Sequence, residues 1–91
     1  MKRAIVTVLG SDRVGIIAAV STRLAQHNIN ILDITQTIMK GEVFVMIALV
    51  DIEGATAPFH EIKADLAELG ASMGLSIRIQ LEEIFNAMHK I

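Results

Sequence analysis

Hydrophobic and polar positions in the first third of the chain change from a strand pattern to a helix pattern and back. Residues 4–9 are apolar and mostly β-branched, which predicts a short strand. Residues 10–15 are glycine-flanked and polar, and they predict a turn. A helix is expected next, ending near Asn28. The apolar positions that recur at its three- and four-residue spacing are Ile16, Ile17, Val20 and Leu24.

The middle of the chain predicts two strands joined by a tight turn. Residues 29–39 are again rich in β-branched side chains, and Lys40, Gly41 and Glu42 form a hairpin turn. Residues 43–50 are continuously apolar, which is typical of a strand covered on both faces. Residues 51–57 predict a loop.

The last third predicts a helix, a strand and a short tail helix. Pro58 suits the first turn of a helix, and Gly74 suits its C-terminal cap. The apolar positions of this helix are Phe59, Ile62, Leu66, Leu69 and Met73. Residues 75–82 alternate strictly between apolar and polar, which predicts a strand with one wet face. Residues 82–91 have the spacing of a short amphipathic helix.

The resulting order, β-α-β-β-α-β with a C-terminal helix, is that of the ferredoxin-like α+β sandwich. Right-handed crossovers place both long helices on one face of a four-stranded antiparallel sheet with strand order 4-1-3-2. We expect a single domain over residues 1–91, with a core of about residues 3–82 and an amphipathic tail at 83–91.

Composition narrows the possible functions. The 91 residues are 53% hydrophobic and only 3% aromatic, which predicts an ordered, aliphatic core. The absence of cysteine excludes disulfides, thiol catalysis and Cys-ligated metal sites. A net charge of −2 argues against nucleic acid as a partner. With no signal-peptide pattern and no apolar run of membrane-spanning length, we expect a cytoplasmic protein.

The side chains suggest binding rather than catalysis. His27, His60 and His89 follow no metal-ligand spacing and are interpreted as surface or helix-end residues. We therefore expect no catalytic residue, no metal and no cofactor. The turn of residues 10–15 is different, because unpaired N–H groups at the start of a helix attract anions. Asp12 in this turn can cap the helix or bind an ammonium group, and a plain capped turn is the alternative interpretation.

Two uncovered surfaces suggest a partner chain. The strand of residues 29–39 is an edge strand with a single charged residue, Asp33, and exposed edges of this kind tend to pair with other chains. The central strands are apolar on both faces, although the helices cover only one. We expect a homodimer. A monomer whose tail, residues 84–91, folds back over the open face is the alternative.

The glycine-flanked turn and the start of the second strand resemble ACT domains. Residues 10–16, Gly10-Ser11-Asp12-Arg13-Val14-Gly15-Ile16, resemble the G-x-D-R-P-G signature that opens the first helix of these domains. Residues 28–31, Asn28-Ile29-Asn30-Ile31, resemble the entry into their second strand. The ending of the chain is similar to that of small stand-alone ACT proteins related to the glycine cleavage system transcriptional repressor.

The resemblance implies a non-catalytic regulatory module that binds a free amino acid, often at a dimer interface. The implied ligand-binding set is the turn, residues 10–16, together with Asn30. In serine-sensing members, the residues that contact the ligand match Asp12 and Asn30 of this chain. A further contact in those members is a histidine, and Gly10 occupies its position here. Val14 replaces the usual proline of the signature.

Asp12 and Asn30 flank the first helix, so a helix of about a dozen residues keeps them roughly 18 Å apart in one chain. Antiparallel pairing of the second strands would bring Asp12 of one chain toward Asn30 of the other. We therefore expect the site to form only in a dimer, with a separate effector protein as a further partner.

Two other functions remain open. One is a ligand-free interaction module that acts by edge-strand pairing. The other is an acylphosphatase-like enzyme using Arg13 and Asn30, the residue types that acylphosphatases use on this fold.

Overall fold

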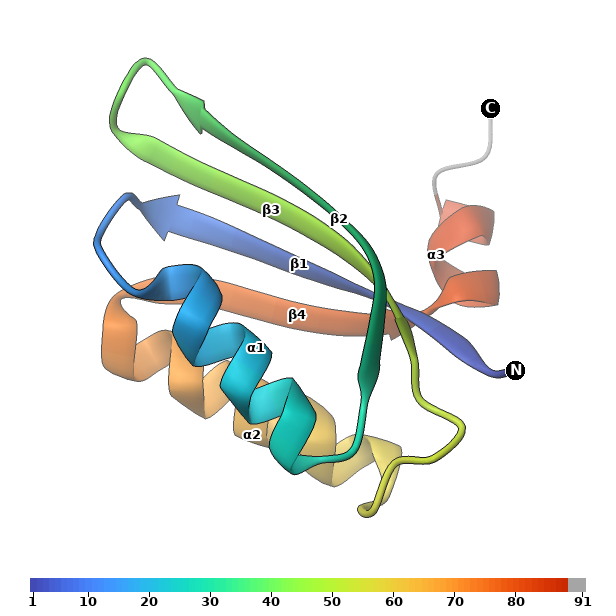
Figure 1. Ribbon diagram of the computed structural model, residues 1–91. Helices are drawn as coiled ribbons and strands as arrows, with labels where there is room; N and C mark the ends of the chain where they lie inside the picture. The colour runs from blue at the N-terminus through green and yellow to red at the C-terminus, as the bar shows by residue number, and fades with distance from the viewer. Residues whose placement is uncertain (89–91) are drawn as a thin grey trace.

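A computed structural model of the protein describes residues 1–88 and confirms the ferredoxin-like architecture (Figure 1). Four antiparallel strands form one sheet in the order β2-β3-β1-β4, the order expected from the sequence. The elements are β1 (Arg3–Ser11), α1 (Ile16–Gln26), β2 (Asn30–Met39), β3 (Val43–Asp51), α2 (Phe59–Met73), β4 (Leu75–Leu81) and α3 (Glu82–Met88).

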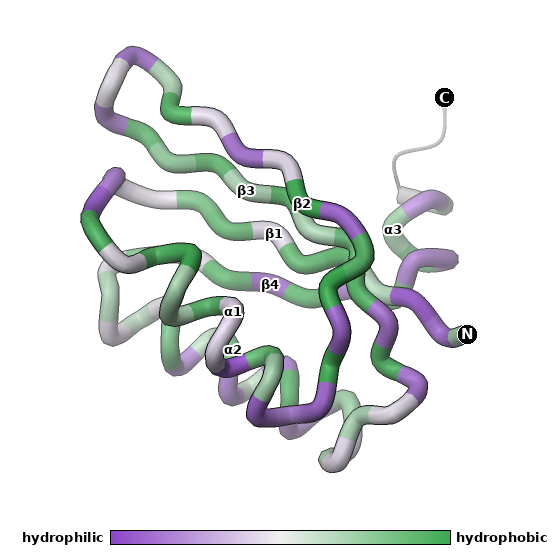
Figure 2. Tube along the Cα trace, viewed as in Figure 1, coloured by the Kyte–Doolittle hydropathy of each residue, from purple (hydrophilic) through white to green (hydrophobic). Residues whose placement is uncertain are grey.

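The core lies between the sheet and the pair α1 and α2, which cover the same face (Figure 1). Every second residue of β1, β3 and β4 points into it, because side chains alternate between the faces of a strand. Figure 2 shows how strongly hydrophobic the central strands β1 and β3 are. The largest side chains that are almost completely buried are Ile16, Leu24, Met46, Ile62, Leu66 and Ile79.

Within residues 1–88 of a single chain, β3 is fully covered on one face only. Phe44, Met46, Ala48 and Val50 are buried on the helix side, whereas Val43 and Ile47 on the other face are 38% and 45% exposed. The continuous apolar run thus corresponds to one face buried by the helices and one apolar face that is partly exposed in the single chain.

The C-terminal helix α3 covers one end of the open face. It contacts β1 and β4, and Ile5 is the open-face residue of β1 that is buried. Arg3 Nη2 lies 2.8 Å from the Glu82 carboxylate and links the start of β1 to the start of α3. The described part of the tail, residues 82–88, thus folds back over one part of the face. The rest of the predicted tail helix, residues 89–91, lies outside the described residues.

Two boundaries differ from the sequence prediction. β1 continues through Gly10 and Ser11, because both residues still pair with β3. Pro58 is the N-cap of α2 rather than a residue of its first turn. Gly74 caps the end of α2 in the left-handed conformation, as expected. None of the helices within residues 1–88 has the length and apolar character needed to cross a membrane.

Candidate functional site

The predicted binding turn begins inside the sheet. Gly10 and Ser11 are the last two residues of β1, opposite Phe44 and Val43. A Cβ atom at Gly10 would lie 2.5 Å from Leu75 Cδ2 and 3.1 Å from the Gly74 carbonyl oxygen. A larger residue here would have to displace the Leu75 side chain and shift the start of β4 slightly, so close packing favours glycine at this position.

Asp12 holds the turn against the β2–β3 hairpin through its backbone. Its N–H donates to the Glu42 carbonyl at 2.7 Å. The interpretation of Asp12 as the helix cap is wrong, because α1 is capped by Gly15 without any side-chain hydrogen bond. Within residues 1–88 the Asp12 carboxylate is exposed and has no hydrogen bond or ion pair. It is therefore available to a ligand cation.

Gly15 sets the direction of α1. Its φ of 93° lies in the left-handed region that favours glycine, and a Cβ there would meet nothing within 4 Å. The first intrahelical bond runs from the Ala19 N–H to the Gly15 carbonyl. The N–H groups of the first turn precede that bond and remain without a helical acceptor.

The other residues of the predicted turn point in different directions. Val14 is 97% exposed, whereas Ile16 is 2% exposed and anchors α1 in the core. Arg13 reaches across to α2, where its Nη1 donates to the Met73 carbonyl at 3.4 Å. Ser11 to Gly15 are thus all exposed, while the side chain of Ile16 is buried and only its backbone can face a ligand.

Asn30 lies at the far end of the molecule. It is exposed and pairs with Asp51 at the end of β3, whereas Ser11 pairs with Val43 at the beginning of β3. Eight residue steps along β3 separate these pairs, a distance of about 27 Å. The structure therefore does not bring Asn30 to the turn within one chain. The same separation keeps Arg13 from Asn30, so the two residues cannot act together as an acylphosphatase pair in one protomer.

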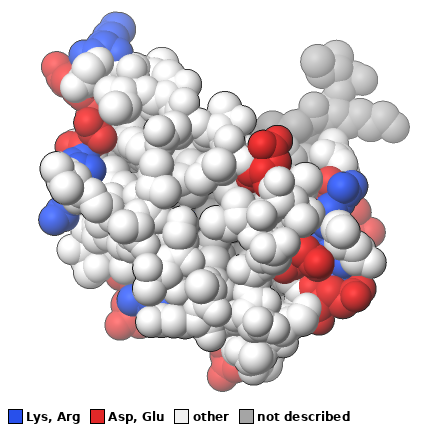
Figure 3. Space-filling model, viewed as in Figure 1, with Lys and Arg blue, Asp and Glu red and all other residues white. Residues whose placement is uncertain are grey.

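An apolar surface runs along the free edge beside β2. On the helix side of the strand, Ile34 and Ile38 are 40% and 48% exposed, and Ile17 of α1 is also partly exposed. The outer face of α1 continues this surface with the small residues Ser21 and Ala25, on the opposite side of the helix from Arg23. Figure 3 shows that the surface over α1 and β2 is largely free of charged groups. We call Ile17, Ser21, Ala25, Ile34 and Ile38 the edge surface.

The sequence indicated the exposed strand edge at residues 29–39, but not the part that α1 contributes to the edge surface. Ile17 follows the apolar helix spacing, yet its side chain is partly exposed. Viewed down the helix axis, Ile17 lies about 60° from the centre of the buried face that Ile16, Val20 and Leu24 form. This angle is the sequence signal for a position at the margin of the core.

A family model described as "ACT domain" matches residues 2–80. The chain belongs to the ACT domain family. A UPF0237 protein of Listeria monocytogenes is 54% identical over 98% of this chain and 99% of its own length. A UPF0237 protein of Methanocaldococcus jannaschii is 47% identical over the full length of both.

Solved structures agree with the membership of the ACT family. An ACT domain protein from Streptococcus pneumoniae is 36% identical, with a TM-score of 0.81 over 97% of this chain and 98% of that one. A putative glycine cleavage system transcriptional repressor matches in fold, with 24% identity and a TM-score of 0.72 over 88% of this chain and 45% of that one. The ACT domain is a regulatory domain that typically binds amino acids or other small ligands.

This ACT domain also holds a polar cluster between its two long helices. Asp65 of α2 accepts a hydrogen bond from Arg23 Nη1 at 2.6 Å and lies 2.7 Å from His27 Nε2. The hydrogen bond with His27 lowers the pKa of the Asp65 carboxyl, partial burial opposes that shift, and the neighbouring Arg23 lowers the pKa further. His27 is the C-terminal cap residue of α1, as its helix-end interpretation expected. The cluster joins α1 to α2.

Two hollows of this ACT domain lie away from the predicted turn. One, of about 380 Å³, lies between α2 and the outer edge of β4. Another, of about 420 Å³, lies on the open sheet face and is lined by Thr7, Leu9, Ile47 and Arg78 among others. Neither contains a residue of the turn or Asn30. Within residues 1–88, no group of three or more acidic or histidine side chains could hold a metal ion.

Proposed function

We propose that this ACT domain binds a free amino acid at the interface between two copies joined along β2. The observation that carries the proposal is the placement of Asp12 and Asn30 at opposite ends of β3, about 27 Å apart. Antiparallel pairing of two β2 strands reverses one copy relative to the other. The Asn30 end of one copy then approaches the Asp12 end of its partner.

The chemistry of the turn suits a zwitterion. The free N–H groups at the start of α1, together with the helix dipole, favour the ligand carboxylate. The Asp12 carboxylate, which has no ion-pair partner within residues 1–88, suits the ammonium group. The exposed amide of Asn30 from the partner copy suits a polar ligand side chain. The missing side chain at Gly10 removes one contact from this set.

The edge surface supports pairing at β2. Adding a second copy would pair the free backbone groups of β2 and cover Ile34 and Ile38, which are partly exposed in the single chain. Small residues at Ser21 and Ala25 would let the two α1 helices approach closely. Amino-acid binding and dimerisation would then be thermodynamically linked.

A thermal-shift screen of the twenty amino acids tests the proposal. A ligand present at 100 times its dissociation constant stabilises the folded state by about 2.7 kcal/mol, which gives a clear shift in Tm. The affinity of the amino acid found in this way should fall as the protein is diluted below its dimer dissociation constant. No shift with any amino acid would favour a ligand-free interaction module instead.

A further inference from the structure

The outer edge of β4 combines an unpaired strand with a hollow and two cations. β4 is the last strand of the sheet, so one row of its backbone N–H and C=O groups has no strand partner among residues 1–88. Beside this row, between β4 and α2, lies the hollow of about 380 Å³. Its lining residues are Lys63, Ala67, Ser76, Ile77, Arg78, Ile79 and Gln80.

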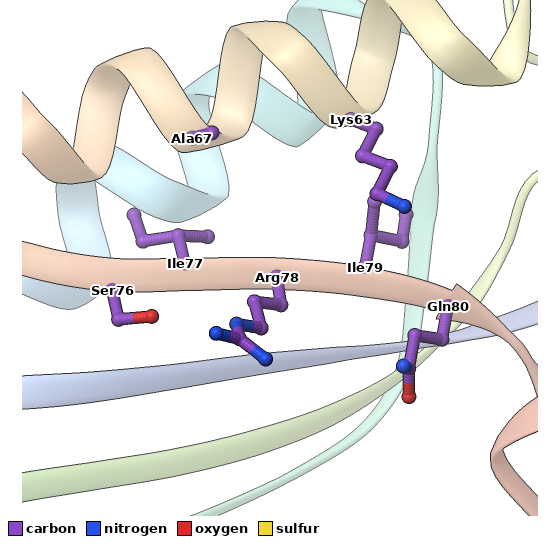
Figure 4. A pocket seen from close by; sticks show the side chains of 7 residues that line it. All are labelled: Lys63, Ala67, Ser76, Ile77, Arg78, Ile79 and Gln80. Atoms are coloured by element: carbon purple, nitrogen blue, oxygen red, sulfur yellow. The ribbon is translucent and has the colours of Figure 1, made fainter.

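Figure 4 shows how these side chains are arranged around the edge. Ile77 and Ile79 point toward α2 and form an apolar floor, and the small side chain of Ala67 leaves space above it. Lys63 extends from α2 toward the edge, whereas Arg78 points away from α2, onto the open face. One cation therefore stands on each side of the strand.

Both cations are available for a partner. Lys63 and Arg78 are exposed, and within residues 1–88 neither forms an ion pair. The chain as a whole has a net charge of −2, so this edge differs in sign from the rest of the molecule.

We propose that the β4 edge binds an extended, acidic segment of another protein, which joins the sheet as a fifth strand. Main-chain hydrogen bonds to the free edge would provide affinity, and alternating side chains would provide specificity. Residues directly opposite each other on neighbouring strands share a face. The residue opposite Arg78 would thus lie on the open face, and its two neighbours would face α2.

This register gives the segment a pattern. An acidic residue is expected opposite Arg78, a second acidic residue opposite Ile79 and facing Lys63, and an apolar residue opposite Ile77 and facing Ala67. The surface is at the opposite margin of the sheet from β2, so binding here is compatible with the edge dimer and does not require an amino acid.

The probe is a fluorescein-labelled peptide, acetyl-Thr-Thr-Glu-Asp-Val-Thr-Thr-amide, titrated into the full chain at low ionic strength without amino acids. Reversing either cation, in Lys63→Glu or Arg78→Glu, should weaken binding about tenfold, because an attraction becomes a repulsion. Lys40→Glu makes the same change of charge at the distant hairpin tip and should leave the affinity unchanged. The double variant Lys63→Glu/Arg78→Glu should instead bind a peptide with two lysines in place of the acids.

Hydrogen exchange provides the structural readout. The backbone amides of β4 should exchange more slowly when the peptide is bound, and proline in place of the peptide's valine should abolish this protection. The proposal is overturned if the peptide does not bind, if the proline peptide binds equally well, or if Lys40→Glu weakens binding as much as Arg78→Glu. If an amino acid still raises the Tm of Arg78→Glu, the amino-acid site at the β2 interface is independent of the peptide site at the β4 edge.

Discussion

Asp12 and Asn30 lie at opposite ends of the same sheet, separated by the eight residue steps of β3 between Val43 and Asp51. The backbone of Asp12 is fixed to Glu42 at the hairpin end, and the backbone of Asn30 pairs with Asp51 at the other. A ligand a few ångströms long cannot touch both residues of one chain. Any site that uses both is therefore shared between copies.

Mixing two defective variants tests this sharing directly. Asp12→Ala and Asn30→Ala should each lose binding of the amino acid found in the thermal-shift screen. Exchange of subunits produces a heterodimer with one intact site, formed by Asn30 of the Asp12→Ala chain and Asp12 of the Asn30→Ala chain. A one-to-one mixture should recover roughly a quarter of the wild-type sites, as measured by titration calorimetry.

The control replaces one partner with the double variant Asp12→Ala/Asn30→Ala. Mixed with Asp12→Ala, it cannot form an intact site and should recover no binding. Equal recovery in both mixtures, or no recovery in either, would exclude a site shared in this way.

The edge surface predicts which apolar residues hold the dimer together. Ile38→Glu should raise the dimer dissociation constant at least about tenfold, because it would place an unpaired charge in the contact. Since Ile38 is already 48% exposed, the monomer should remain folded. Ile47→Glu is the matched control, because Ile47 is 45% exposed but lies on the open face. Sedimentation equilibrium distinguishes the two variants, and equal weakening by both would contradict the edge dimer.

The local patterns of the sequence were sufficient to predict the fold. Strict alternation in β4 and the spacing from Phe59 to Met73 each correspond to one element with one buried face. These patterns could not predict how far a strand continues. β1 extends to Ser11 because β3 offers partners, which is a property of the pairing and not of residues 10 and 11 themselves.

The candidate site was predictable only in part. The glycine at position 15 indicates a turn of unusual conformation, and its φ of 93° agrees. The role of Gly10 was not visible, because it depends on Leu75, which is 65 positions away in the chain. The cluster of Asp65 with Arg23 and His27 is likewise a long-range contact between two helices. No local pattern places those three side chains together.

We expect Gly70→Ala to destabilise the protein, although helix propensity favours alanine over glycine. Alanine is favoured over glycine inside a helix by about 1 kcal/mol. A Cβ at this buried position in α2, however, would lie 2.6 Å from the Leu75 carbonyl oxygen and 3.1 Å from the Ile77 nitrogen. These are backbone atoms of β4, so α2 and the sheet would have to separate, at a cost of about 1–3 kcal/mol.

We therefore expect Gly70→Ala to lower the free energy of unfolding, measured by urea denaturation. Ala71→Gly, at the neighbouring exposed position, should also lower it, through propensity alone. A stabilised Gly70→Ala protein would show that α2 can move away from β4 without loss.

The Asp65 cluster predicts how stability depends on pH. The pKa of Asp65 in the folded protein is lowered from its ordinary value of 3.8, chiefly by the hydrogen bond with His27. The contribution of the ionised carboxylate is therefore fully present above that value and is lost as the pH falls through the lower, folded-state pKa. Asp65→Asn should cost about 1 kcal/mol at pH 7, and its difference from the wild type should shrink steadily below about pH 4. Urea denaturation at pH 7, 5, 4 and 3 measures this difference.

The control is Glu68→Gln, on the exposed side of α2, which should change the free energy of unfolding little at any pH. If the difference between Asp65→Asn and the wild type stayed constant down to pH 3, the charge of the Asp65 carboxylate would contribute nothing to stability.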